Sequence, residues 1–350
     1  MTSSLRVLAP GLFTTVQDLG RPGYQRLGIA VSGAMDPVSF RAANALVGNL
    51  PDTGALEVAY VGPTLQADAE EVRLSFAGAN AQIEILPNQG ASMGRRFVPG
   101  RSVRLRRGEV VQVGSLSDGA VMYIGVEGGF NIPPVLGSVS TYVRGGFGGW
   151  HGRKLRPGDC LPLCRDRPSQ RGDYSLTKLD LSLPRRFRCT IGPQANLFSD
   201  REMTRFFESE YVISPDSDRV GMRLCGPIIH ELRNVNVISD GIAPGSVQVP
   251  GNGQPIVLLA DRQTMGGYPK IATVISADLP ALGRIRIGAK IAFELVSIEV
   301  AQELRREAVA QIDTIADKIK PISPSPSQML SLLFDCNLID GVVSADNWLS

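Results

Sequence analysis

Histidine is nearly missing from this sequence of 350 residues, which contains only His151 and His230. Two histidines exclude metal sites built from several imidazoles, and they weaken any interpretation as a serine–histidine hydrolase. Each is better explained as a loop or packing residue. We therefore expect no metal, and we assign any acid–base chemistry to Asp, Glu, Lys or Tyr side chains.

Cysteine is also sparse, with five residues that are widely spread. An odd, scattered set predicts reduced thiols in the cytoplasm rather than a disulfide framework. Cys160 and Cys164 lie four residues apart, but no second pair and no nearby histidine completes a zinc set. We interpret both as packing residues.

Long runs of one charge or of apolar residues are absent, and the net charge is only +2. A dedicated nucleic-acid-binding protein would show a basic face or stripe, so we expect no nucleic-acid partner. No apolar run has membrane-spanning length, and the first residues lack the charged and apolar regions of a signal peptide. These features predict a cytoplasmic protein without a membrane partner.

Glycine and proline are abundant, at 38 and 24 residues, and they separate short β-rich segments. Strands at this spacing predict sheets or barrels rather than alternating strand–helix units. The expected strands include residues 72–76, 81–86, 102–106, 110–113, 121–126, 187–191, 256–260 and 291–296.

Two helices are expected among these strands. Residues 37–47 follow Asp36, a plausible N-cap, with Pro37 at the first helical position and Gly48 as a stop. Residues 299–320 carry apolar side chains at steps of three or four, which predicts a helix with one apolar stripe. The proline- and serine-rich segment 321–328 then breaks the helix.

A polar segment around residues 165–184 predicts a domain boundary. We expect a first subdomain at 1–165, a linker at 166–186, a second subdomain at 187–298, a C-terminal helix at 299–320, and a linker and tail at 321–350. A weak echo supports two related halves, because Asp18 and Arg21 precede a small-residue turn much as Asp218 and Arg219 do.

The segment 250–275 is the most informative about function. A buried strand ends in a carboxylate, a guanidinium, an amide, a hydroxyl and an ammonium within ten residues, around Gly266 and Gly267. Polar groups at a turn on rigid strands are typical of small-molecule sites. With the neighbouring segment 239–250, the pattern predicts one polar rim, although two hairpins with satisfied side chains would explain it too. The rim would contain Asp240, Gln248, Asp261, Gln263, Thr264, Tyr268 and Lys270.

Other polar stretches favour structural roles. Asp18 and Arg21 suit a pair that pins a turn, with anion recognition as the alternative. Glu57 lies in a packed stretch and suits a buried pair. The glycine-rich segment 145–159 is not a phosphate loop, because no Gly-Lys-Ser/Thr sequence closes it.

Across about residues 5–300 the chain resembles the biotin-dependent carboxyltransferase A/B-subdomain family. That family includes the C subunit of bacterial 5-oxoprolinase, the second subunit of allophanate-hydrolase-like pairs, the antagonist of a sporulation-kinase inhibitor, and part of urea carboxylase. The matching motifs lie at 10–28, 32–36, 43–49, 56–58, 128–138, 152–153, 192–194, 217–226, 239–250 and 255–275.

The resemblance implies a mainly β fold with two cyclophilin-like β-barrel subdomains, few helices and a C-terminal helix. It also implies a partner subunit that carries the remaining carboxyltransferase subdomains, with the site at the joint surface and a small amide or lactam as substrate. Family members differ in chemistry: one complex uses ATP to open the lactam of 5-oxoproline, and another transfers a carboxyl group from carboxybiotin to urea.

Missing motifs narrow this choice. The sequence lacks a biotin-acceptor Met-Lys-Met, an ATP-binding signature and the serine-rich machinery of amidases. We therefore predict an enzyme subunit, with little activity alone, of an ATP-dependent amidohydrolase of the 5-oxoprolinase type. ATP would act at the level of the complex, and no biotin would be attached to this chain.

The implied roles are divided among the rim residues and one arginine. Lys270 and Arg219 would stabilise developing negative charge, and Asp261 or Asp240 would accept a proton or orient water. Substrate contacts would come from Gln248, Gln263, Thr264 and Tyr268 beside Gly266 and Gly267. The alternatives are a carboxyltransferase half of a biotin-dependent urea or amide carboxylase, and a non-enzymatic regulator of a kinase-inhibitor-like partner.

Overall fold

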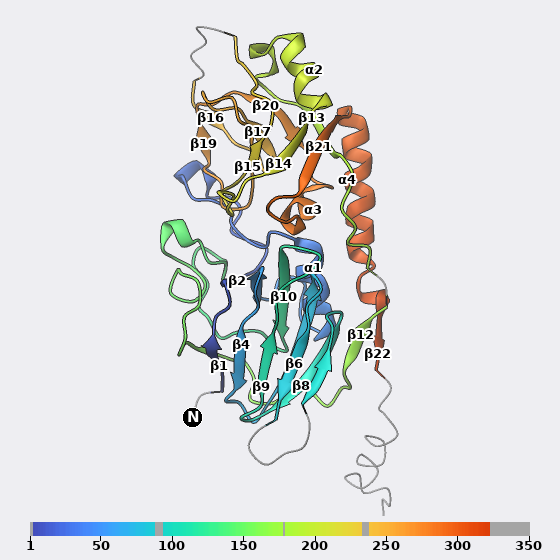
Figure 1. Ribbon diagram of the computed structural model, residues 1–350. Helices are drawn as coiled ribbons and strands as arrows, with labels where there is room; N and C mark the ends of the chain where they lie inside the picture. The colour runs from blue at the N-terminus through green and yellow to red at the C-terminus, as the bar shows by residue number, and fades with distance from the viewer. Residues whose placement is uncertain (1–2, 88–93, 178, 233–237, 323–350) are drawn as a thin grey trace, which may run out of the picture.

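Two β subdomains lie end to end in the computed structural model, which describes residues 3–87, 94–177, 179–232 and 238–322 (Figure 1). The mainly β class expected from the sequence is confirmed. All eight segments expected as strands fall on observed strands, with bounds that differ by at most two residues. Most of the predicted tail lies outside the described residues.

The first subdomain packs two sheets around one apolar core that draws side chains from both. Strand β10 (Val121–Val126) is buried along its whole length, because the core covers one face and helix α1 (Pro37–Leu46) covers the other. One sheet has the order β11 (Cys160–Pro162), β1 (Ser4–Ala9), β4 (Thr64–Ala67), β9 (Val110–Val113), β6 (Ile83–Leu86), β7 (Arg95–Phe97). The other has the order β2 (Phe13–Gln17), β3 (Ala55–Ala59), β10, β5 (Glu71–Gly78), β8 (Arg101–Arg106), β12 (Tyr174–Leu176), β22 (Ile319–Pro321).

The second subdomain is a closed barrel around its own core. Its strand order is β13 (Phe187–Ile191), β20 (Lys270–Val274), β17 (Ser246–Gln248), β18 (Ile256–Leu258), β15 (Gly221–Cys225), β14 (Glu210–Ile213), β21 (Lys290–Leu295). A two-stranded ribbon of β16 (Asp240–Gly241) and β19 (Met265–Gly266) lies beside it, with helices α2 (Asp200–Glu208) and α3 (Leu279–Arg284). Short 3₁₀ turns occupy Gln25–Leu27, Val143–Gly145, Ala195–Leu197 and Ala316–Lys318.

Helix α1 begins where the sequence predicted. The Asp36 side chain accepts a hydrogen bond from the backbone N–H of Val38, and Pro37 occupies the first helical position. Both features favour helix initiation at this point. The helix ends at Leu46, one residue before the predicted end.

The C-terminal helix is shorter than the sequence predicted. Helix α4 spans Ile298–Asp313 instead of 299–320, and it runs along the side of the molecule from the barrel to the first subdomain (Figure 1). The chain then turns so that Ile315 is buried in the core beside α1, and residues 319–321 form β22. Tertiary burial therefore ends a pattern that local periodicity would have continued. Within the described ranges, no helix has the length and apolar character needed to cross a bilayer.

The predicted linker 166–186 is also more ordered than expected. Its residues 174–176 form β12, which pairs with β8 on one side and with β22 on the other. A polar composition is compatible with an edge strand as well as with a linker. Residues 174–176 of the predicted linker therefore belong to a sheet of the first subdomain.

The two subdomains approach each other closely at α3. A Cβ atom added to Gly283 would lie 2.2 Å from the carbonyl oxygen of Met35 in the first subdomain. Nearby, the carbonyl of Arg284 accepts a hydrogen bond from the backbone N–H of Ala120. Glycine at 283 is what permits this contact between the subdomains.

Candidate functional site

Lys270 and Asp240 meet at the rim of the barrel. Lys270 opens β20, and β16 pairs with β19 so that Asp240 lies opposite Gly266. The Lys270 Nζ lies 3.1 Å from Asp240 Oδ2 and donates to the carbonyl of Gly241 at 3.2 Å. The lysine side chain is 1% exposed, whereas that of Asp240 is 56% exposed. A buried ammonium thus faces a carboxylate that remains in contact with water.

Two amides lie beside this pair. Gln248 on β17 pairs in register with Lys270, and Gln263 Nε2 lies 3.5 Å from Gln248 Oε1. Gln248 Nε2 in turn lies 3.5 Å from the carbonyl of Tyr268. A Cβ atom at Gly266 would approach Gln248 Nε2 to 2.9 Å, so glycine leaves the room that the amides occupy. These long contacts leave the amide groups with capacity for other partners.

The predicted residues Thr264, Gly267 and Tyr268 lie between β18 and β20, in the segment that contains β19. Tyr268 and Gly267 are exposed, and Thr264 is half-buried, with its carbonyl accepting from the N–H of Ile242 at 3.0 Å. The structure therefore brings together Asp240, Gln248, Gln263, Gly266, Tyr268 and Lys270. Asp240 and Tyr268 face solvent, whereas Gln248 and Lys270 are buried behind them. Their chemical roles stay predictions.

Gln194 belongs to this group and was missed as a site residue. Its Nε2 lies 3.3 Å from Asp240 Oδ2, and its Oε1 accepts from the backbone N–H of Lys270 at 3.2 Å. The available signal was its place in the family motif at residues 192–194. Nothing in the local pattern distinguished it from a turn residue.

Asp240 is held in its ionised form by these neighbours. The hydrogen bond from Lys270 lowers its pKa below the ordinary value of 3.8, helped by the backbone N–H of Gly241, the lysine charge and Gln194. A carboxylate that stays charged while open to water can orient a water molecule or accept a proton. The rim thus combines an ammonium, a carboxylate and neutral amides.

Asp261, which was predicted to belong to the rim, instead joins Arg219 in a different cluster. Arg219 Nε donates to Asp261 Oδ2 at 2.9 Å, and its Nη1 donates to Glu57 of the first subdomain. Ser32 and the carbonyl of Gly33 complete the contacts. The partners of Asp261 are Ser32 of the first subdomain and Arg219 of the second, and residues 250–275 alone could not reveal either of them.

This second cluster continues through the subdomain boundary. The Tyr123 hydroxyl donates to Glu57 Oε2 at 2.6 Å and accepts from the backbone N–H of Asp36 at 2.9 Å. Burial raises the pKa of Tyr123, and the charge of Glu57 adds to that shift. Burial opposes the charge on Arg219, but Asp261 and Glu57 outweigh it and raise the pKa of the guanidinium. We call this set the boundary network: Ser32, Asp36, Glu57, Tyr123, Arg219 and Asp261.

A cavity of about 410 Å³ adjoins the boundary network between the subdomains. Its walls are mostly apolar, with Leu12, Tyr60 and Met222 among them. Four charged residues line it. Arg219 and Glu57 are paired with each other, Asp218 accepts hydrogen bonds from the backbone N–H groups of Val220 and Gly221, and Lys154 Nζ lies 6.0 Å from the centroid of the Phe13 ring. Most of these charged groups therefore already have partners within the protein. Within the described residues, no three His, Cys, Asp or Glu side chains gather as a metal site would require.

The comparisons with known proteins decide the family. Residues 27–295 match the family described as "Carboxyltransferase domain, subdomain A and B". The chain belongs to this family. The match covers most of the first subdomain, the barrel, the rim and the boundary network.

Relatives with names fall into two groups. The chain is similar to the C subunit of 5-oxoprolinase from Escherichia coli K12, 34% identical over 89% of this chain and 97% of that protein. It is also similar to the C subunit of 5-oxoprolinase from Haemophilus influenzae, 36% identical over 86% and 94% of the two chains. Urea amidolyase of Saccharomyces cerevisiae is 30% identical over 93% of this chain, but only 18% of the yeast protein is covered.

A solved structure supports the same family. The urea carboxylase of Kluyveromyces lactis matches with a TM-score of 0.80 and 28% identity, over 92% of this chain and 31% of that one. The named relatives are parts of enzymes, so the chain has an enzyme-associated role and relatives that work as subunits of a larger assembly.

Proposed function

We propose that this chain is a subunit of a multi-subunit, ATP-dependent amidohydrolase of the 5-oxoprolinase type, which converts 5-oxoproline to glutamate. The observation that carries the proposal is the match to the C subunits of two 5-oxoprolinases, at 34–36% identity and over 94–97% of those proteins. The urea amidolyase relative is matched over a far smaller share of its length.

In this proposal the rim provides the chemistry. The Lys270 ammonium stabilises negative charge that develops on the carbonyl oxygen as the lactam is attacked. Asp240, ionised and open to water, orients the attacking water or accepts its proton. Gln248 and Gln263 hold the substrate amide, with Thr264 and Tyr268 at the edge. We leave Arg219 and Asp261 out of the chemistry because their polar atoms are bonded to each other and to the first subdomain.

A partner subunit would complete the site. The rim is open to solvent, and the exposed side chains of Ile238, Met265 and Tyr268 beside it supply apolar area for a partner to cover. Enclosure by a partner would lower the local dielectric and strengthen the action of Lys270 on the substrate. ATP is assigned to the other subunits, and no residue of this chain is assigned to it.

Reconstitution tests the proposal. The chain is purified with the products of neighbouring genes, and ATP-dependent release of glutamate from 5-oxoproline is measured. We expect turnover only with the full set of subunits, and loss of turnover in Lys270→Met. A complete set of folded subunits that releases no glutamate would contradict the proposal.

A carboxyltransferase activity is the second candidate, favoured by the family description and by the TM-score of 0.80 to a urea carboxylase. In that case the rim would hold urea or another amide while a separate carrier delivers carboxybiotin. The same set of subunits, supplied with a carboxylated biotin carrier and urea, distinguishes the two. Carboxyl transfer without glutamate release would favour this second candidate.

A further inference from the structure

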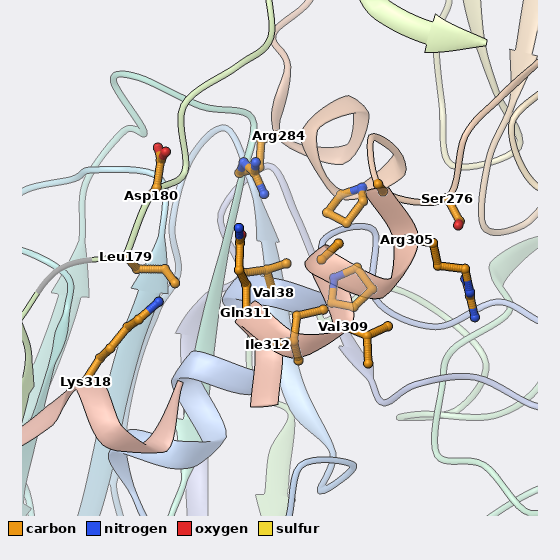
Figure 2. A pocket seen from close by; sticks show the side chains of 14 residues that line it. Val38, Leu179, Asp180, Ser276, Arg284, Arg305, Val309, Gln311, Ile312 and Lys318 are labelled. Atoms are coloured by element: carbon orange, nitrogen blue, oxygen red, sulfur yellow. The ribbon is translucent and has the colours of Figure 1, made fainter. Parts of the chain in front are cut away.

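A second cavity, which none of the rim residues lines, lies where α1, α3 and α4 meet the segment after β12. Its volume is about 270 Å³. Figure 2 shows Gln311 of α4 pointing toward Arg284 of α3, with Lys318 reaching into the same space beside Leu179. Neither the boundary network nor the rim uses these three side chains together.

Arg284 is buried but incompletely bonded. Its residue exposure is only 8%. Its Nη1 lies 3.1 Å from Asp36 Oδ1, yet neither Nη1 nor Nε makes a hydrogen bond to any described residue. A buried guanidinium nitrogen without an acceptor costs free energy unless something else satisfies it. The cavity wall is where such an acceptor would enter.

The charge of the cavity favours an anion. Arg284, Lys318 and Arg305 contribute three cations to the wall, against the single carboxylate of Asp180. Asp36 stands behind Arg284 and offsets part of its charge, so the balance stays positive even when Asp36 is counted. The guanidinium of Arg305 is turned away from Arg284 (Figure 2). Without it, the cations Arg284 and Lys318 would balance the carboxylates of Asp180 and Asp36, so the net positive charge of the cavity comes from Arg305.

The volume of the cavity and its uncharged lining residues indicate which class of anion it could bind. Ligand pockets commonly occupy about 300–1,000 Å³, so this cavity of about 270 Å³ lies just below that range and fits only a small ligand. Much of the wall is aliphatic, from Val38, Leu179, Pro280 and Ile312. A guanidinium fork matches the geometry of a carboxylate, and aliphatic walls suit a short hydrocarbon body.

We propose that this cavity is a binding site for a small organic carboxylate, held by Arg284 and Lys318 with Gln311 as a neutral donor. The site is separate from the proposed reaction at the rim and does not depend on it. A carboxylate oxygen accepts from Arg284, and the aliphatic part of the ligand packs between α1 and α4.

Binding to the purified chain tests the proposal, with glutarate as the probe and calorimetry as the readout. Glutaramide, which has the same shape without charge, and inorganic phosphate, which has charge without a hydrocarbon body, are the comparison ligands. We expect saturable glutarate binding with a Kd of about 0.1–1 mM, and no binding of glutaramide. Absence of glutarate binding up to about 10 mM, or tighter binding of phosphate, would overturn the assignment.

Matched variants locate the binding. Arg284→Lys keeps a charge beside Asp36 but loses the fork, and we expect about 10-fold weaker binding. Lys318→Gln, on a partly exposed residue, should weaken binding about 3-fold. Arg286→Lys and Lys320→Gln are controls two residues away that do not line the cavity. Equal weakening in the controls, or unchanged binding in both test variants, would refute the site.

Discussion

The rim and the boundary network both join a cation of the barrel to carboxylates, but they leave those carboxylates in different environments. Asp240 is 56% exposed beside Lys270, whereas Glu57 and Asp261 are each 5% exposed beside Arg219. In the boundary network every charged side chain forms an ion pair with another side chain of the protein. At the rim the ammonium is buried while its partner remains hydrated, so a substrate can compete for it. The contrast suggests different roles for the two cations: Arg219 links the subdomains, and Lys270 is available for chemistry.

The largest expected effect is on the boundary network. Arg219→Met removes the only cation that contacts both Glu57 and Asp261 in the described residues. Two buried carboxylates would lose their partner, and we expect a loss of about 3–5 kcal/mol in unfolding free energy. Urea denaturation measures it. Arg223→Met, an exposed change on β15, is the control and should stay within about 0.5 kcal/mol of the parent. Equal free energies of unfolding for the two variants would show that the boundary network does not stabilise the fold.

A substitution at the rim should affect catalysis strongly and stability only slightly, unlike one in the boundary network. Lys270→Met keeps an apolar stem in place and leaves Asp240 in water, so we expect a stability change below about 1 kcal/mol. In the reconstituted enzyme kcat should fall about 100-fold or more, because charge on the substrate oxygen loses its ammonium. Lys290→Met, on an exposed lysine of β21, serves as the control. Full activity in Lys270→Met would remove the lysine from the mechanism.

A smaller change probes the room around the amides. Gly266→Ala would place a Cβ 2.9 Å from Gln248 Nε2 and 2.8 Å from Ile242 Cδ1, displacing the groups that hold the substrate. We expect KM to rise roughly 10-fold with little change in thermal stability. Gly241→Ala on the paired strand meets no atom within 4 Å and is the matched control. Identical KM values for both variants would place the substrate elsewhere.

The smallest effect concerns the titration of Asp240. Lys270 lowers its pKa below 3.8, so Lys270→Met should move the titration of this carboxyl to higher pH. Because the folded pKa is the depressed one, any stabilisation from the pair is present above the unfolded pKa and is lost as pH falls through the folded value. Carbon NMR of the labelled carboxyl follows the shift. An unchanged titration in the variant would mean that the lysine does not control Asp240.

The sequence predicted correctly those features that depend on residues close together in the chain. Strand residues 121–126 and the N-cap at Asp36 depend on neighbours a few positions away, and both agree with the structure. Glu57 was interpreted as a member of a buried pair, which the contact with Arg219 confirms. The identity of that partner could not be predicted, because the two residues lie 162 positions apart.

The rim was predicted in part for the same reason. Lys270, Gln248 and Gln263 come together through neighbouring strands and one turn, so their proximity follows from local β structure. Asp261 lies on the same turn, but its partners are distant in the sequence, and one of them belongs to the first subdomain. Helix α4 ends early for a comparable reason, since burial of Ile315 is a long-range effect.

Because β12 pairs with β22 in a sheet of the first subdomain, the barrel is an insertion in the chain between these two strands. These antiparallel strands resemble the two arms of a hairpin, and the backbone N–H of Thr177 donates to the carbonyl of Lys318 at 2.8 Å where the turn would be. A chain in which a short linker replaces residues 187–297, and which keeps Ile315 in the core beside α1, should therefore retain both sheets of the first subdomain. Ending the chain at residue 186 instead would strip β22 away and leave β12 as an unprotected edge, open to self-association.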